Sequence, residues 1–181
     1  MSVTHALNFN FTSISQDTVF VLDSNVLYFV HSGYYLPNDP KSIAYSNIVQ
    51  QIFSNGYAII VSALTVQEML FGIENNEYRE YCRQNRIDKC NYSKKDFRCD
   101  SSLRSGVKVK INRVLTELSC YKIDEGVMRK SDIIDFANSF EGHHMDPIDY
   151  VLVRNYDSSK TIFVTDDRDF ASVPSLQILT A

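Results

Sequence analysis

The sequence predicts an α/β protein of three layers, in which helices cover both faces of a central parallel sheet of about four to five strands. Short apolar runs of strand length, such as residues 19–22 and 161–165, are typical of strands buried on both faces of a parallel sheet. Helical patterns separate these runs, and such alternation is typical of parallel α/β folds. The 181 residues, 44% hydrophobic and 22% charged, suit a single domain.

Composition also indicates where the protein works. No apolar run approaches the roughly 20 residues that a membrane-spanning helix needs, and the N-terminus has neither the basic nor the apolar part of a secretory signal. We therefore expect a cytoplasmic protein with no membrane contact. The cysteines are irregularly spaced and include no Cys-x-x-Cys pair, so we expect reduced thiols and no zinc site. They are Cys82, Cys90, Cys99 and Cys120.

The N-terminal residues 1–17 are polar, and we expect an arm or edge segment, with a single domain over residues 18–181. The first strand of that domain, residues 19–22, ends at Asp23, where the chain turns into a helix that Ser24 or Asn25 can cap. Ligands of open α/β sheets bind at the carboxyl ends of strands, so Asp23 lies at the ligand-binding edge. A helix cap is the alternative role for Asp23.

The second strand also leads to an acidic residue. A helix over about residues 43–53 ends at Asn55 and Gly56, a pair typical of helix C-termini. Strand residues 57–62 follow, and then Thr65 and Glu68, which have the spacing of a capping box. Glu68 is therefore either a helix cap or a second acid just beyond a strand.

A basic helical insert occupies about residues 75–114, with interruptions expected near residues 91–93 and 101–106. Residues 77–113 hold 11 Lys or Arg against five acids, a charge of +6, while the rest of the chain carries −10. This distribution favours a polyanionic partner at the insert, although long charged helices are often simply solvated. Four aromatic residues could stack on unpaired bases or pack internally; they are Tyr78, Tyr81, Tyr92 and Phe97.

The third strand is expected over residues 118–124, followed by a helix from about 125 to 140. Asp146 as N-cap and Pro147 as first residue then begin another helix. Asp149 falls in its first turn, near the positive end of the helix, and is either a capping group or a ligand.

The fourth strand, residues 161–165, ends in a cluster of acids, and residues 176–179 are expected as a final edge strand. The cluster comprises Asp166, Asp167 and Asp169. Three carboxylates within four residues repel one another unless a cation or a helix end compensates their charge. A turn of this kind is most readily tolerated when it binds metal.

Four strand ends thus deliver acidic residues, and in a parallel sheet these ends converge on one edge. The acids are Asp23, Glu68, Asp149 and Asp167. Carboxylate and water oxygens select Mg²⁺ or Mn²⁺ over zinc. Two such ions can activate a water and stabilise both oxygens of a phosphodiester displacement. An acidic pocket together with a basic insert therefore predicts a metal-dependent nuclease, with the insert holding the nucleic-acid backbone through Lys94, Lys95, Arg98, Arg104 and Lys108.

Four segments resemble, in order and approximate spacing, the acidic motifs of PIN-domain ribonucleases, including VapC-like toxins. They are VLDSNVLYF, SALTVQEMLFGI, DPIDYVLV and FVTDDRDF, and the likeness runs from about residue 18 to the end of the chain. The resemblance implies a PIN-like fold and Mg²⁺- or Mn²⁺-dependent cleavage of RNA, often by a homodimer, with toxins neutralised by an antitoxin protein. The chain departs from the compact toxins in the long basic insert between Glu68 and Asp149.

The resemblance also implies residue roles. Asp23, Glu68, Asp149 and Asp167 match the metal-binding catalytic acids, and Asp169 is an auxiliary metal ligand. Asn25 is an orienting partner of the first acid. Thr165 and Phe170 match the final T-x-D-x-x-F pattern, which leaves Asp166 off the site.

Two other functions remain open. A haloacid-dehalogenase-like phosphatase would use Asp23 as nucleophile, but it needs a second aspartate two residues later, where this chain has Asn25, and its lysine candidate, Lys160, precedes the strand. A non-catalytic RNA- or protein-binding module could keep the same fold. His143 and His144 adjoin Asp146 and could supply a general base, although a role in the loop before the helix is the alternative.

Overall fold

The computed structural model describes residues 2–5, 8–36, 38–142, 144–173 and 175–181. These residues form a parallel sheet of six strands in the order β1-β6-β5-β2-β3-β4. The predicted α/β class is confirmed, and the sheet has one strand more than the upper expectation. The strands are β1 (Ser2–His5), β2 (Val19–Leu22), β3 (Ala58–Ser62), β4 (Lys122–Asp124), β5 (Thr161–Val164) and β6 (Gln177–Thr180).

The additional strand comes from the N-terminal segment. β1 pairs in parallel with β6, with Val3 opposite Ile178 and Thr4 opposite Leu179. The strand predicted over residues 176–179 forms as β6, at Gln177–Thr180. The prediction that it lies at the edge of the sheet is wrong, because β1 pairs with its outer side. A four-residue strand with polar residues at both ends carries too weak an alternation to be recognised in the sequence.

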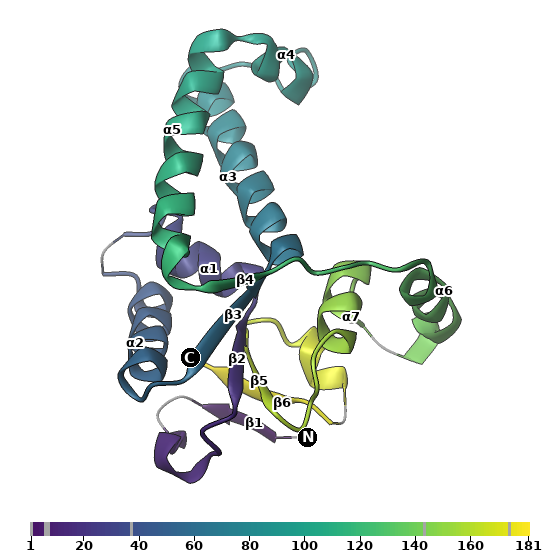
Figure 1. The fold of residues 1–181 in the computed structure, drawn as a ribbon. Helices are drawn as coiled ribbons and strands as arrows, with labels where there is room; N and C mark the ends of the chain where they lie inside the picture. Colours follow the sequence, from purple (N-terminus) through teal and green to yellow (C-terminus); the bar gives the residue numbers. More distant parts are fainter. Residues whose placement is uncertain (1, 6–7, 37, 143, 174) are drawn as a thin grey trace.

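The helices cover both faces of the sheet, as predicted. Phe20 and Leu22 of β2 pack with α1, α2 and α3 on one face, whereas Val21 packs with Leu152 of α7 on the other, and Figure 1 shows these layers. Successive residues of one strand thus enter different cores. The helices are α1 (Ser24–His31), α2 (Pro40–Ser54), α3 (Ala63–Gln84), α4 (Lys94–Cys99), α5 (Ser101–Glu117), α6 (Lys130–Ser139) and α7 (Pro147–Arg154).

The basic insert is a helical arm that stands away from the sheet, built from the outer part of α3 together with α4 and α5 (Figure 1). It has a small core of its own, formed by Tyr78, Cys82, Phe97 and Val107. The predicted interruption at residues 101–106 is wrong. Asp100 caps α5 through hydrogen bonds from two backbone N–H groups, so the helix begins there and continues without a break.

Two predicted boundaries also change. Residues 118–120 form a 3₁₀ turn that extends α5, so β4 begins only at Lys122. The next helix begins at Lys130 instead of residue 125. Gly126 explains the delay, because its φ of +58° interrupts helical geometry and a Cβ there would lie 2.3 Å from Ser62 Oγ. The link before α6 therefore packs closely against the start of α3.

The four cysteines are free, and Cys82 alone among them is buried. Among the helices of the described ranges, none combines the length and apolar character needed to cross a bilayer.

Candidate metal centre

Asp23 lies at the carboxyl end of β2 and is 4% exposed. It is also the N-cap of α1: its Oδ1 accepts a hydrogen bond of 2.6 Å from the backbone N–H of Ser24. Its Oδ2 accepts hydrogen bonds of 2.6 Å from Asn25 Nδ2 and from the hydroxyl of Thr165. Burial raises the pKa of Asp23 to about 6, against the lowering effect of Thr165 and Ser24. Capping and a role as ligand are thus compatible for this side chain.

Asn25 and Thr165 join the ends of β2 and β5. Asn25 donates to Asp23 and accepts a hydrogen bond of 3.1 Å from the backbone N–H of Asp166. The Thr165 hydroxyl donates to Asp23 and accepts a hydrogen bond of 2.9 Å from the N–H of Asp167. These bonds fix the position of the first carboxylate and the course of the acidic turn at the same time.

Glu68 approaches the same place from α3. The predicted capping box is wrong, because Ser62 caps α3 through a hydrogen bond from the N–H of Leu64, which puts Glu68 well inside the helix. Burial raises the pKa of Glu68, and the charges of Asp146 and Asp167 add to that rise. Hydrogen bonding from the Ser24 side chain opposes it. Glu68 is therefore held against the first turn of α1 and is not used as a cap.

Asp149 lies in the first turn of α7, as predicted. Asp146 is the N-cap, and its carboxylate accepts hydrogen bonds from the N–H groups of Ile148 and Asp149. Because Asp146 does the capping, the Asp149 carboxylate is free for another role. Its pKa is raised to about 8, first by burial and then by the charges of Asp23, Asp146, Glu68 and Asp167.

The acidic turn after β5 divides its carboxylates between two environments. Asp167 is half-buried and accepts a hydrogen bond of 2.8 Å from the N–H of Asp169. Its charge reaches Asp23, Glu68 and Asp149. Asp166 instead forms an ion pair with Lys41 and accepts a hydrogen bond from the hydroxyl of Tyr45. Asp169 begins the short 3₁₀ turn that follows, and its expected metal contact stays a prediction.

Four carboxylates therefore converge at one edge of the sheet. The charges of Asp23, Glu68 and Asp167 all raise the pKa of Asp149, which costs free energy unless protons or a cation compensate. In kind, these oxygen donors fit Mg²⁺ or Mn²⁺. Within the part of the chain that the structure describes, no three His, Cys, Asp or Glu side chains form a ready-made metal-binding group as they stand. The four carboxylates that converge at this edge belong to Asp23, Glu68, Asp149 and Asp167.

The five basic residues predicted to bind RNA lie on α4 and α5, and all are exposed. Arg98 forms an ion pair with Glu74. Arg104 and Lys108 line a hollow of about 340 Å³ together with Ser101 and Ser105. Lys94 and Lys95 occupy the first turn of α4. The structure thus shows four of the five without an ion pair to any described residue.

The aromatic residues of the insert pack internally. Tyr78 and Phe97 are 7% and 3% exposed, and their rings meet edge to face. Tyr92 stacks on Tyr78, and its backbone carbonyl accepts a hydrogen bond from the Tyr78 hydroxyl. Of the two alternatives, internal packing is the one that the structure shows.

The other candidates have different surroundings. His143 lies outside the described residues, and His144 is exposed before α7. Lys160 forms an ion pair with Asp17 and precedes β5, so it lies at the opposite end of that strand from the acids. A phosphatase would need its lysine near the acids.

Three further residues take part in the site in ways that the sequence did not predict. Ser24 contacts Glu68, Lys41 neutralises Asp166, and Arg168 lines a hollow of about 500 Å³ with Asn25 and Asp167. The position of Ser24 directly after Asp23 was a usable signal. Lys41 is separated from Asp166 by more than 120 residues, and nothing local in the sequence reveals their pairing.

No protein-family model and no curated protein sequence matches this chain. Solved structures are similar in fold. A chain of VapBC2 from Rickettsia felis, bound to a DNA fragment from its promoter, aligns with a TM-score of 0.53 and 13% identity over 90% of this chain and 98% of that chain. DNA-bound VapBC from Salmonella typhimurium aligns with a TM-score of 0.46 and 17% identity, over 90% of this chain and 98% of that chain. FitAcB from Neisseria gonorrhoeae aligns with a TM-score of 0.49 and 12% identity, over 88% of this chain and 96% of that chain. The VapBC2 likeness agrees with the predicted PIN-like α/β fold.

Proposed function

We propose that the protein is a Mg²⁺- or Mn²⁺-dependent endoribonuclease that hydrolyses phosphodiester bonds in RNA. The observation that carries this proposal is the convergence of four carboxylates at the carboxyl edge of a parallel sheet. Burial, and after it their mutual repulsion, raises the pKa of Asp149 to about 8 and that of Asp23 to about 6. A protein keeps such a cluster at a cost in stability, which a bound cation offsets. The four motifs that resemble PIN-domain ribonucleases give independent support.

In this proposal Asp23, Glu68, Asp149 and Asp167 hold one or two cations. A bound divalent ion supplies activation of the attacking water and neutralisation of charge at the phosphodiester. The chain itself supplies positioning. Asn25 and Thr165 hold both the Asp23 carboxylate and the turn that carries Asp167. Asp149, with a pKa of about 8, holds a proton at neutral pH in the cation-free protein and releases it when a cation binds.

Basic residues around this edge would hold the RNA backbone. Arg168 adjoins Asp167 at the edge itself. Lys94, Lys95, Arg104 and Lys108 extend the positive surface along the arm, where phosphate contacts add affinity without reading sequence. Arg98 contributes less in this scheme, because Glu74 already neutralises it.

We further propose that the nuclease is the toxin of a toxin–antitoxin pair, with an antitoxin protein as partner and a homodimer as the working form. The support is the resemblance of the four acidic motifs to those of VapC-like toxins. The fold likeness to a chain of VapBC2 is consistent with it. On this proposal, induced expression of the wild-type chain alone arrests growth, and expression of the Asp149→Asn variant does not.

The nuclease proposal is tested by incubating a mixed RNA pool with purified protein in Mg²⁺, Mn²⁺ or EDTA. We expect products with either metal and none in EDTA. Asp149→Asn should abolish them, whereas Asp135→Asn, which changes a carboxylate on α6 paired with Arg154, should leave them unchanged. Equal cleavage by wild type and Asp149→Asn would refute the proposal.

A further inference from the structure

A pocket begins at Glu68, one of the four carboxylates, and extends between α1 and α3. It has a volume of about 390 Å³, within the range of small-molecule sites. Ser24 and Glu68 at one part of its lining belong to the candidate metal centre. The rest of its lining includes Tyr28, Tyr35, Phe71 and Asn75. The pocket is thus continuous with the place where a phosphodiester would be cleaved.

The aromatic residues of this pocket are exposed where apolar rings are normally covered. Phe71 is 52% exposed and Tyr35 is 38% exposed. Tyr28 is held firmly behind them: its ring stacks on Tyr34 at a centroid distance of 5.7 Å and an angle of 10°. A Cβ on Gly72 would lie 3.2 Å from the Tyr28 ring, so the absence of a side chain at Gly72 lets that ring pack closely on α3. The Tyr28 ring is therefore a fixed aromatic surface in the lining, and the Tyr35 ring meets it edge to face.

The Tyr28 side chain, whose ring lines the pocket, carries a buried polar group. The Tyr28 hydroxyl is buried and has no hydrogen-bond partner among the described residues. Burying a hydroxyl in this state costs free energy in the unliganded protein. A ligand that carries a hydrogen-bonding edge next to a flat ring system would satisfy it. Asn75 offers both a donor and an acceptor in the same pocket.

We propose that this pocket binds one unpaired nucleobase of the RNA, next to the bond that is cleaved. The inference rests on the proposed nuclease function and names the residues that receive one base of its substrate. Aromatic side chains stack on any unpaired base, whereas a base inside an RNA duplex cannot enter such a pocket. The Tyr28 hydroxyl and Asn75 then face the hydrogen-bonding edge of the base.

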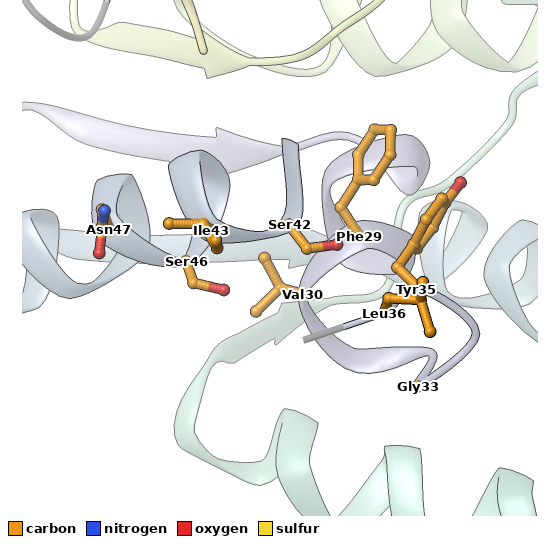
Figure 2. A pocket seen from close by; sticks show the side chains of 9 residues that line it. All are labelled: Phe29, Val30, Gly33, Tyr35, Leu36, Ser42, Ile43, Ser46 and Asn47. Carbon is orange, nitrogen blue, oxygen red and sulfur yellow. The ribbon is translucent and has the colours of Figure 1, made fainter. Parts of the chain in front are cut away.

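A neighbouring pocket is less suited to a base. It has the same volume, about 390 Å³, and shares Phe29 and Tyr35 with the first. Figure 2 shows these two rings at one end of it and residues of α2 at the other. The rest of its lining consists of aliphatic residues, such as Val30 and Leu36, and polar residues of α2, such as Ser46, so it adds no further ring for stacking. The pocket beside the carboxylates is therefore the one assigned to the base.

The test measures binding of a fluorescein-labelled single-stranded RNA of about 12 nucleotides, a length within the site sizes of single-strand binders. Anisotropy is followed in Mg²⁺ in the Asp149→Asn background, so that the RNA stays intact. Phe71→Ala should weaken binding about 5- to 100-fold, the range expected for loss of one stacked base. Phe71→Trp should retain it. Phe53→Ala, which removes a 42% exposed ring of α2 outside the pocket, should also retain it.

A second variant separates a binding role from a structural one. Tyr28→Phe keeps the ring and removes the unpaired hydroxyl, so its thermal unfolding temperature should stay unchanged or rise while RNA binding weakens. The same RNA annealed to its complement should bind wild type and Phe71→Ala equally. If Phe71→Ala binds the single strand as tightly as wild type does, the pocket is not a base site.

The two proposals fail in different ways. RNA binding that depends on Phe71, without any cleavage of the pool by wild-type protein, would overturn the nuclease and keep the base site. Metal-dependent cleavage that is unimpaired by Phe71→Ala would overturn the base site and keep the nuclease. Equal loss of single-stranded and duplex binding in Phe71→Ala would also overturn the base site.

Discussion

Replacing Asp149 with asparagine should stabilise the metal-free protein at pH 8. The pKa of Asp149 is raised to about 8 by burial and by four neighbouring acids. Because the folded-state pKa lies above the unfolded value, the stabilising contribution of the protonated form is complete below about pH 4 and is lost as the pH rises to about 8. Asparagine is neutral throughout this window, so the variant should not show the loss.

The size of the effect follows from the same shift. One pKa unit corresponds to about 1.4 kcal/mol, so a rise from 3.8 to about 8 gives an unscreened cost of about 6 kcal/mol. Solvent reaches this partly buried side chain, and screening reduces the expected gain to about 1–2 kcal/mol at pH 8. At pH 5 the gain should be smaller than at pH 8, because only part of the difference in ionisation free energy between the folded and unfolded states has developed at that pH.

The assay is urea unfolding followed by circular dichroism, in EDTA, at pH 5 and pH 8. Asp135→Asn is the matched control, since its carboxylate is 42% exposed and paired with Arg154. We expect that control to change the free energy of unfolding by less than about 0.5 kcal/mol at either pH. An Asp149→Asn protein that is no more stable than wild type at pH 8 would refute the electrostatic reasoning.

Three further predictions concern the same site and the arm. Thr165→Val should lower the free energy of unfolding, measured in urea, by about 1–3 kcal/mol, because it removes a donor to buried Asp23 and an acceptor for the N–H of Asp167. Thr165→Ser keeps the hydroxyl and should be nearly as stable as wild type. Mg²⁺ should raise the unfolding temperature of wild type at pH 8 by more than that of Asp149→Asn, as scanning calorimetry would show, and equal shifts would argue against metal binding at the carboxylates. Lys94→Glu with Lys95→Glu should weaken RNA binding and reduce its salt slope by about 2, and an unchanged slope would show that α4 makes no phosphate contact.

The sequence was sufficient to predict the layers of the fold and the edge at which the acids meet. Buried parallel strands appear as short apolar runs, so β2, β3 and β5 could be recognised from residues such as Val21 and Phe163. Asp146 and Pro147 were equally clear, because capping is a local property of the chain. Local signals therefore gave both the sheet and the helix that positions Asp149.

The errors came from contacts between distant parts of the chain. β1 exists because it pairs with β6, and the delay of α6 reflects the packing of Gly126 on Ser62. Thr65 has the sequence of a cap, but the chain turns helical earlier, at Ser62. The aromatic pocket between α1 and α3 was also hidden, since Tyr28 and Phe71 come together only when two helices pack side by side.

The central claim is that the four carboxylates jointly hold the cation that RNA cleavage requires. The most direct measurement follows Mn²⁺ occupancy by electron paramagnetic resonance and RNA cleavage in the same samples as Mn²⁺ is added. We predict that the two rise together in wild type and that both are lost in Asp149→Asn. Cleavage that persists in EDTA, or that is undiminished in a variant unable to bind Mn²⁺, would contradict the claim.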